Sequence, residues 1–306
     1  MNQAIAAFGL AIVTLGIASA WLYDKYLRLR PVPLAPGVTA ILGGGGNSLV
    51  VVSDDAVLII DPKFGPPAGA LKRWVTRNTN GAVSVIVNTH YHYDHSQGNA
   101  RYPGAQILAF DTVRGFMLGE ANDFNDPGWW RARTPSLPNQ AVGSSGTTLT
   151  FGGHTLVLVH PGAAHTRGDL CVYLPSEDVV VTGDLLFHTY YPFFNGSPAG
   201  CSIPGLIAAL RQLAGEHSSA RFVPGHGPIA KADDLVRFAE YLEAVQSGIA
   251  RALQDGLSEG DTVKRISGSI AAWKLTPLPS MLGWRFLLST ARNNVRWAYR
   301  ILSAER

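Results

Sequence analysis

The sequence predicts a mixed α/β fold that contains more than one β-sheet. Short runs of β-branched residues and longer amphipathic stretches occur in both halves of the region 31–263. Some runs are joined by short turns, which is typical of hairpins, and others by helical stretches, which is typical of crossovers. Apolar residues make up 46% of the 306 residues and charged residues 15%, so the chain can bury a large core and is not disordered as a whole.

Strands and helices alternate along this region. Residues 39–61 are interpreted as a hairpin whose turn contains Asp54 and Asp55. A basic helical stretch at 67–78 precedes a strand at 83–87. Further strands are expected at 147–158, 170–174 and 179–182, and helices at 203–214 and 231–257.

Residues 4–23 carry no charged side chain and predict a membrane anchor. Twenty helical residues reach roughly 30 Å, which is the thickness of the hydrocarbon core of a bilayer. The alternative is a cleaved signal peptide with its cleavage motif at 18–20, but no Lys or Arg precedes the apolar run. Residues 1–30 are therefore assigned to a single-pass N-terminal anchor or a signal peptide. Positive charge after the run favours a position of the bulk of the chain in the cytoplasm, with the periplasmic or extracellular side as the alternative.

Charge is distributed unevenly along the chain. Residues 31–263 contain 14 basic and 20 acidic residues, which argues against a nucleic-acid partner. Residues 264–306 contain eight basic residues and one acidic residue, interleaved with aromatic residues, and are assigned to a helical tail. Such a tail can contact an anionic membrane surface. The alternative is a helix packed on the domain, and it is preferred for 293–302.

A cluster of potential metal ligands follows directly on the strand at 83–87. His90, His92, Asp94 and His95 lie within six residues. In an extended segment the side chains of His90 and His92 point the same way, so both can reach one ion. Asp94 and His95 can then face a second ion. Imidazole nitrogen and carboxylate oxygen are ligands that suit zinc.

Three later segments supply the ligands that this cluster lacks. His165 lies in the loop HPGAAHTRGD, Asp184 ends a strand within TGD, and His226 lies in the turn PGHG. Each residue alone is a weak signal, but together with the cluster they complete two metal sites.

The order HxHxDH, HPGAAHT, TGD and PGHG resembles the metallo-β-lactamase-fold hydrolase superfamily over roughly residues 35–260. The resemblance implies a four-layered αβ/βα sandwich with the metals at one edge between two sheets, and a catalytic domain over 31–263. It implies that one metal is held by His90, His92 and His165 and the other by Asp94, His95 and His226. Asp184 then bridges the two ions.

The resemblance and the ligand set together predict a membrane-anchored hydrolase with two zinc ions, for which iron or manganese are the alternative metals. A hydroxide shared by the two ions attacks the substrate, and Asp94 is expected to act as a catalytic residue that orients it. With a carboxylate at the position of Asp184, the chain resembles glyoxalase-type and lactonase-type hydrolases more than the zinc β-lactamases that carry a cysteine at that position. The expected substrate is a small molecule with an ester, thioester or lactone bond. The alternatives are a zinc β-lactamase that cleaves an amide and a mononuclear iron persulfide dioxygenase.

Candidates for substrate contact come from residues near Asp184. His188 follows it by one turn, and Tyr191 belongs to an aromatic run that either lines a pocket or belongs to the core. The segment 124–138, with Trp129 and Trp130, is interpreted as a loop that can cover the site.

Overall fold

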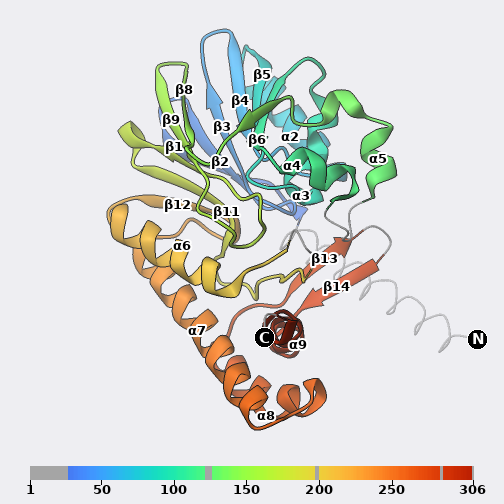
Figure 1. Cartoon of the computed structure of the whole chain (residues 1–306). Coiled ribbons are helices and arrows are strands. Elements are labelled where there is room, and N and C mark those ends of the chain that lie inside the picture. The colour runs from blue at the N-terminus through green and yellow to red at the C-terminus, as the bar shows by residue number, and fades with distance from the viewer. Residues whose placement is uncertain (1–26, 121–125, 197–199, 283–284, 305–306) are drawn as a thin grey trace, which may run out of the picture.

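The computed structural model describes residues 27–120, 126–196, 200–282 and 285–304. Two β-sheets lie face to face in this part of the chain (Figure 1). The prediction of a mixed α/β fold with more than one sheet is therefore confirmed. The first sheet contains Arg30–Ala35 (β1), Val38–Leu42 (β2), Ser48–Val52 (β3), Ala56–Ile60 (β4), Ala82–Val87 (β5), Gln106–Phe110 (β6) and Gln140–Val142 (β7). The second contains Thr147–Phe151 (β8), His154–Val159 (β9), Cys171–Leu174 (β10), Val179–Phe187 (β11) and Arg221–His226 (β12).

The strands of the first sheet lie side by side in the order of the chain, and their pairing changes from antiparallel to parallel at β4. β1 to β4 pair antiparallel, and the expected hairpin turn at Asp54 and Asp55 joins β3 to β4. From β4 to β7 the strands are parallel. The helix expected at 67–78 is α2 (Gly65–Asn78), which connects the parallel strands β4 and β5.

The second sheet pairs antiparallel from β8 to β11, and β12 adds parallel to β11. The crossover from β11 to β12 contains α6 (Ile203–Glu216), and α7 (Ala232–Gln254) follows β12. Both helices lie where the sequence predicts them.

Three groups of buried side chains define the layers. One lies between the sheets and includes Leu58 of the first and Val172 of the second. The outer face of the first sheet packs on α2 through Leu71 and Val75. The outer face of the second sheet packs on α6 and α7 (Figure 1). The order of layers is helix, sheet, sheet, helix. The loop after β5, the loop after β9, and the strands β11 and β12 carry the side chains that meet in one place.

Short helices lie in the connections: Tyr93–Ser96 (α3), Gln97–Arg101 (η2), Val113–Gly115 (α4), Phe116–Glu120 (η3), Pro127–Arg131 (α5), Thr134–Ser136 (η4) and Pro175–Glu177 (η5). α5 and η4 lie in the segment expected to cover the site. Tyr93 stacks on Trp130, and its hydroxyl accepts a hydrogen bond from the backbone N–H of Asp126. This segment therefore packs beside the HxHxDH turn, and its residues 124–125 lie outside the described part.

The end of the chain packs on α7. It comprises α8 (Glu259–Ala271), a hairpin of β13 (Leu278–Leu282) and β14 (Arg285–Ser289), and α9 (Ala291–Ala304). α9 buries Val295, Ala298 and Ile301, as expected for a helix packed on the domain. The boundary expected at residue 263 falls within α8.

The expected anchor at 4–23 lies outside the described residues. Within the described ranges, no helix has both the length and the apolar character that a membrane span requires.

Candidate metal centre

The HxHxDH motif occupies the turn between β5 and α3. The backbone N–H and the hydroxyl of Thr89 both donate to the carboxylate of Asp61, which directly follows β4. The backbone carbonyl of Thr89 accepts a hydrogen bond from Leu170 of the second half of the domain. His90 and His92 follow this fixed point, and α3 then presents Asp94 and His95.

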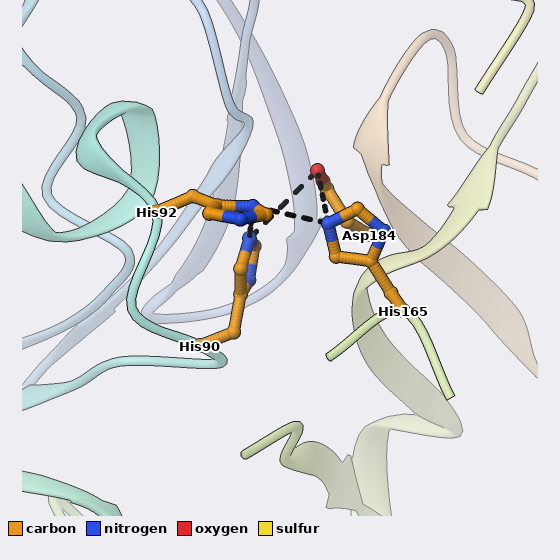
Figure 2. A group of neighbouring side chains, drawn as sticks. All are labelled: His90, His92, His165 and Asp184. Atoms are coloured by element: carbon orange, nitrogen blue, oxygen red, sulfur yellow. Dashed lines mark hydrogen bonds and ion pairs between the residues drawn. The ribbon is translucent and has the colours of Figure 1, made fainter. Parts of the chain in front are cut away.

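The first group of ligands combines residues from both halves of the domain. His90 and His92 approach from one side, and His165 and Asp184 from the other (Figure 2). Nδ1 of His92 lies 3.0 Å from Nε2 of His90 and 3.1 Å from Nε2 of His165. Oδ2 of Asp184 lies 3.4 Å from Nε2 of His165 and 3.8 Å from Nε2 of His90. All four residues are buried.

The second group contains Asp94, His95 and His226, whose ligand atoms also lie within 4.8 Å of one another. Oδ2 of Asp94 lies 3.3 Å from Nε2 of His226 and 3.8 Å from Nε2 of His95. The side chain of Asp94 is 28% exposed, whereas that of His95 is 0% and that of His226 9% exposed. Asp94 therefore lies at the open side of the centre.

Asp184 lies between the two groups. Its Oδ2 faces the first group, and its Oδ1 lies 3.0 Å from Nε2 of His95 and 3.4 Å from Nε2 of His226. A Cβ at Gly225 would lie 1.9 Å from this Oδ1, so the glycine that precedes His226 is required for the close approach. The two carboxylate oxygens therefore contact different groups, as the bridging position requires.

Burial and charge set the pKa values of these side chains. Burial lowers the pKa of His90 and His165, that of His165 to about 3, so both rings are neutral at neutral pH. For His226, burial acts in the same direction, but the charges of Asp184 and Asp94 outweigh it and raise the pKa to about 9. Burial acts to raise the pKa of Asp94, but the charges of His95 and His226 lower it to about 2.

The residues present fit a pair of divalent metal ions. Imidazole nitrogens and carboxylate oxygens converge from seven side chains, which is a donor set that suits zinc, iron or manganese. Nε2 of His95 and Oδ1 of Asp184 lie 3.0 Å apart, but both are buried and neither has a hydrogen bond of acceptable geometry among the described residues. Such atoms are costly unless a partner such as a cation satisfies them.

Asp61 is a functional residue that the sequence interpretation missed. Besides Thr89, its carboxylate accepts a hydrogen bond of 2.7 Å from Nδ1 of His95, because a carboxylate can only accept. The Thr89 hydroxyl gives its proton to Asp61 and so accepts from Nδ1 of His90, 3.0 Å away. Asp61 thus leaves Nε2 of His90 and of His95 free for a metal. The sequence signal that could have identified Asp61 is the position of an acidic residue directly after a strand of apolar residues.

Asp169 stabilises the loop that carries His165 by a similar set of hydrogen bonds. Its carboxylate accepts hydrogen bonds from the backbone N–H and the hydroxyl of Thr166, and its backbone carbonyl lies 2.7 Å from Nδ1 of His160. Burial raises the pKa of Asp169 to about 7. These bonds fix the HTRGD turn and with it the position of His165.

The expected substrate residues lie beside the centre and in the core. Nδ1 of His188 lies 2.9 Å from the carbonyl oxygen of Pro228, and its Nε2 lies 3.5 Å from Asp234. Tyr191 is buried, and its ring packs against Tyr241 of α7. Contact of either residue with a substrate stays a prediction.

Residues 41–226 match the family described as Metallo-beta-lactamase superfamily. Because the match covers more than half of the chain, the protein belongs to the metallo-beta-lactamase superfamily. The seven His and Asp side chains of the centre form two groups that could each hold a metal ion.

Similar curated proteins are hydroxyacylglutathione hydrolases. That of Synechococcus sp. (strain JA-3-3Ab) is 32% identical over 135 residues, which are 42% of this chain and 44% of the relative. That of Brucella ovis is 30% identical over 155 residues, which are 47% of this chain and 52% of the relative. The chain therefore spans about half the length of the curated relatives it matches.

Similar solved structures are metallo-beta-lactamases. That from Pontibacter korlensis has a TM-score of 0.57 at 21% identity and covers 71% of this chain and 99% of its own. That of DIM-1 has a TM-score of 0.56 at 19% identity, over 71% of this chain and 97% of its own. At such identities the likeness shows the fold alone.

Proposed function

We propose that this protein uses two divalent metal ions, zinc by preference, to hydrolyse an ester, thioester or lactone bond of a small molecule, and that a thioester is the preferred substrate. The observation that carries the proposal is the position of Asp184 between the two groups of ligands, with one oxygen toward each. The relatives named hydroxyacylglutathione hydrolase support the thioester, because an acylglutathione carries its acyl group on sulfur.

The side chains have distinct parts in this reaction. Divalent ions held by the seven ligands would act as Lewis acids and would lower the pKa of water toward 7. Asp94 is the catalytic carboxylate: its low pKa keeps it ionised, and its position at the open side lets it accept a hydrogen bond from the attacking water. Asp61 holds His90 and His95 in one tautomer each.

Cleavage of a β-lactam amide is the less favoured alternative. Cys171 lies in β10 and Cys201 lies just before α6, and neither belongs to the groups of possible ligands found among the described residues. Oxidation of a persulfide needs one iron, whereas the donor set here is arranged in two groups.

The test is a substrate panel with metal replacement. Full-length protein in detergent is stripped with a chelator, reloaded with zinc, and assayed with a hydroxyacylglutathione, a lactone and a chromogenic cephalosporin. We expect zinc-dependent hydrolysis of the thioester with kcat/KM of at least about 10⁴ M⁻¹s⁻¹. Hydrolysis of the cephalosporin alone would assign the amide activity, and oxygen consumption with a persulfide and iron would assign the dioxygenase.

We further propose that residues 4–23 tether the enzyme to a membrane, with the catalytic domain on the cytoplasmic side. The uncharged sequence of this segment and the basic residues that follow it support the proposal. The basic residues after 263 are a second candidate contact with the membrane surface.

A further inference from the structure

Lys63 is a fully buried lysine two residues after Asp61. Its ammonium group donates three hydrogen bonds, to the backbone carbonyls of Ile41 at 3.0 Å, Gly43 at 2.6 Å and Gly46 at 2.7 Å. An ammonium has three protons, and all of them are used. Its backbone φ of 66° lies in the left-handed region, which side chains other than glycine rarely adopt. Lys63 thus combines a buried charged group with a left-handed backbone conformation, and both are energetically unfavourable. This combination indicates a specific structural role.

The three carbonyls belong to one loop and the strand end before it. Residues 43–46 are four consecutive glycines, here called the glycine loop, and three of them have positive φ. A Cβ at Gly46 would lie 2.4 Å from the ring of His95, and one at Gly45 would lie 3.1 Å from the Cβ of Asp94. The backbone of the glycine loop thus packs directly on two ligands of the second group.

Asn47 connects the same loop to the third ligand of that group. Its side-chain oxygen accepts from the N–H of Gly43 at 2.9 Å. Its side-chain nitrogen donates to the carbonyls of Pro224 and Gly227, each at 2.9 Å, and its backbone N–H donates to Gly225 at 2.7 Å. These three residues surround His226. The glycine loop therefore reaches Asp94, His95 and the turn of His226 together.

We propose that Lys63 is a positioning residue for the metal site formed by Asp94, His95 and His226, which it maintains by holding the glycine loop against them. The inference rests on the proposed pair of metal ions. Two histidines of the other site are held by separate bonds: Thr89 contacts His90, and Asp169 fixes the turn that carries His165. Loss of the ammonium should therefore weaken one metal site selectively.

The test is a zinc titration of the full-length Lys63→Met variant against a competing chelator. His226→Ala and His165→Ala identify which binding step belongs to which site. We expect Lys63→Met to weaken the step lost in His226→Ala by about 10–100-fold, as for other residues that orient metal ligands, and to leave the other step within about threefold. The inference is overturned if the variant binds zinc at each step as tightly as the wild type does. It is also overturned if both steps are weakened equally.

Matched controls separate this effect from general destabilisation. Lys72→Met removes an exposed lysine of α2 that donates to Arg101, and both steps should stay unchanged. Gly46→Ala keeps Lys63 but forces the loop away from His95, so it should weaken the same step even where Lys63→Met fails to fold. Gly143→Ala, whose Cβ would meet open space, is its control. An unchanged step in Gly46→Ala would contradict the inference.

The titration also separates this inference from the proposed function. A wild-type protein that binds two ions but hydrolyses no thioester refutes the substrate class, and the affinities of the variants still decide the role of Lys63. A wild-type protein with a single binding step overturns both.

Discussion

At the scale of single residues, the centre depends on side chains that hold the ligands as much as on the ligands. Asp61 contacts His95 directly and His90 through Thr89, so one carboxylate orients a histidine in each group. In metal-binding histidines, the N–H of the ring nitrogen that does not bind the metal commonly donates a hydrogen bond in this way. This bond raises the basicity of the ligand nitrogen.

Asp61→Asn should weaken metal binding at both sites, by about 10–100-fold at each. The amide keeps one acceptor but cannot accept all three hydrogen bonds from Thr89 and His95. The free energy of unfolding should fall by about 1–3 kcal/mol because a buried donor loses its partner. Zinc competition titrations and urea unfolding measure the two effects. Asp55→Asn, in the exposed turn between β3 and β4, should change neither, and unaltered zinc affinity in Asp61→Asn would contradict this role.

Acidification should remove the second metal before the first. His226, with its pKa raised to about 9, carries a proton at neutral pH in the metal-free protein and must release it to bind a metal. Burial acts to lower the pKa of His95 in the same site, but the charges of Asp184, Asp94 and Asp61 raise it well above its ordinary value, so His95 must also release a proton. The apparent affinity of this site should therefore fall by at least about tenfold for each pH unit below 8. His165, with its pKa lowered to about 3, competes with no proton in this range. Zinc titrations between pH 6 and 8 measure both slopes, and equal slopes would contradict the assignment.

At the scale of secondary-structure elements, α9 packs close to the candidate metal centre. The hydroxyl of Tyr241 in α7 donates to Oδ1 of Asn294 in α9 at 2.6 Å, and both side chains are buried. Phe193 packs between Trp297 of α9 and His92, with ring centroids 5.0 Å and 6.4 Å apart. The end of the chain is thus one side chain away from a metal ligand.

Tyr241→Phe should lower the free energy of unfolding by about 1–3 kcal/mol, because Asn294 is left with an unsatisfied buried oxygen. The matched change Tyr299→Phe removes a half-buried hydrogen bond to Leu257 and should cost about 1 kcal/mol or less. Urea unfolding measures both values. Equal costs, or a separate transition for the end of the chain, would contradict the packing of α9 as part of the domain.

The sequence predicts elements whose signal is local and misses those that depend on distant partners. The hairpin around Asp54 and the helix α7 follow from alternation and helical periodicity. β6, β7 and the hairpin of β13 and β14 are short and weakly patterned, and pairing with their neighbours defines them.

The same distinction holds for the centre. The seven ligands lie in recognisable motifs, so the sequence predicts which residues meet. The bond of Asp61 to His95 joins residues 34 positions apart, and no periodicity reveals it. The role of Lys63 depends on a backbone turn and three carbonyls, which carry no side-chain signal.

At the scale of the whole molecule, we predict that the proposed anchor and the proposed hydrolase are separable parts. The buried side chains of the described ranges form three cores. Removal of residues 1–26 should yield protein in the soluble fraction with unchanged zinc content and turnover, whereas the full chain should sediment with membranes. Fractionation and activity assays measure this. A full chain in the soluble fraction would refute the anchor, and truncated protein that still sediments would make another surface the principal tether.

We propose that seven side chains from both halves of the domain hold two metal ions, with Asp184 shared between them. Elemental analysis of wild-type protein and Asp184→Asn, each resupplied with zinc and freed of excess, tests it most directly. We expect two zinc ions per chain in the wild type and one or none in the variant, with unchanged helical content. A wild-type protein that holds no transition metal after resupply, or a variant that keeps both ions, would contradict it.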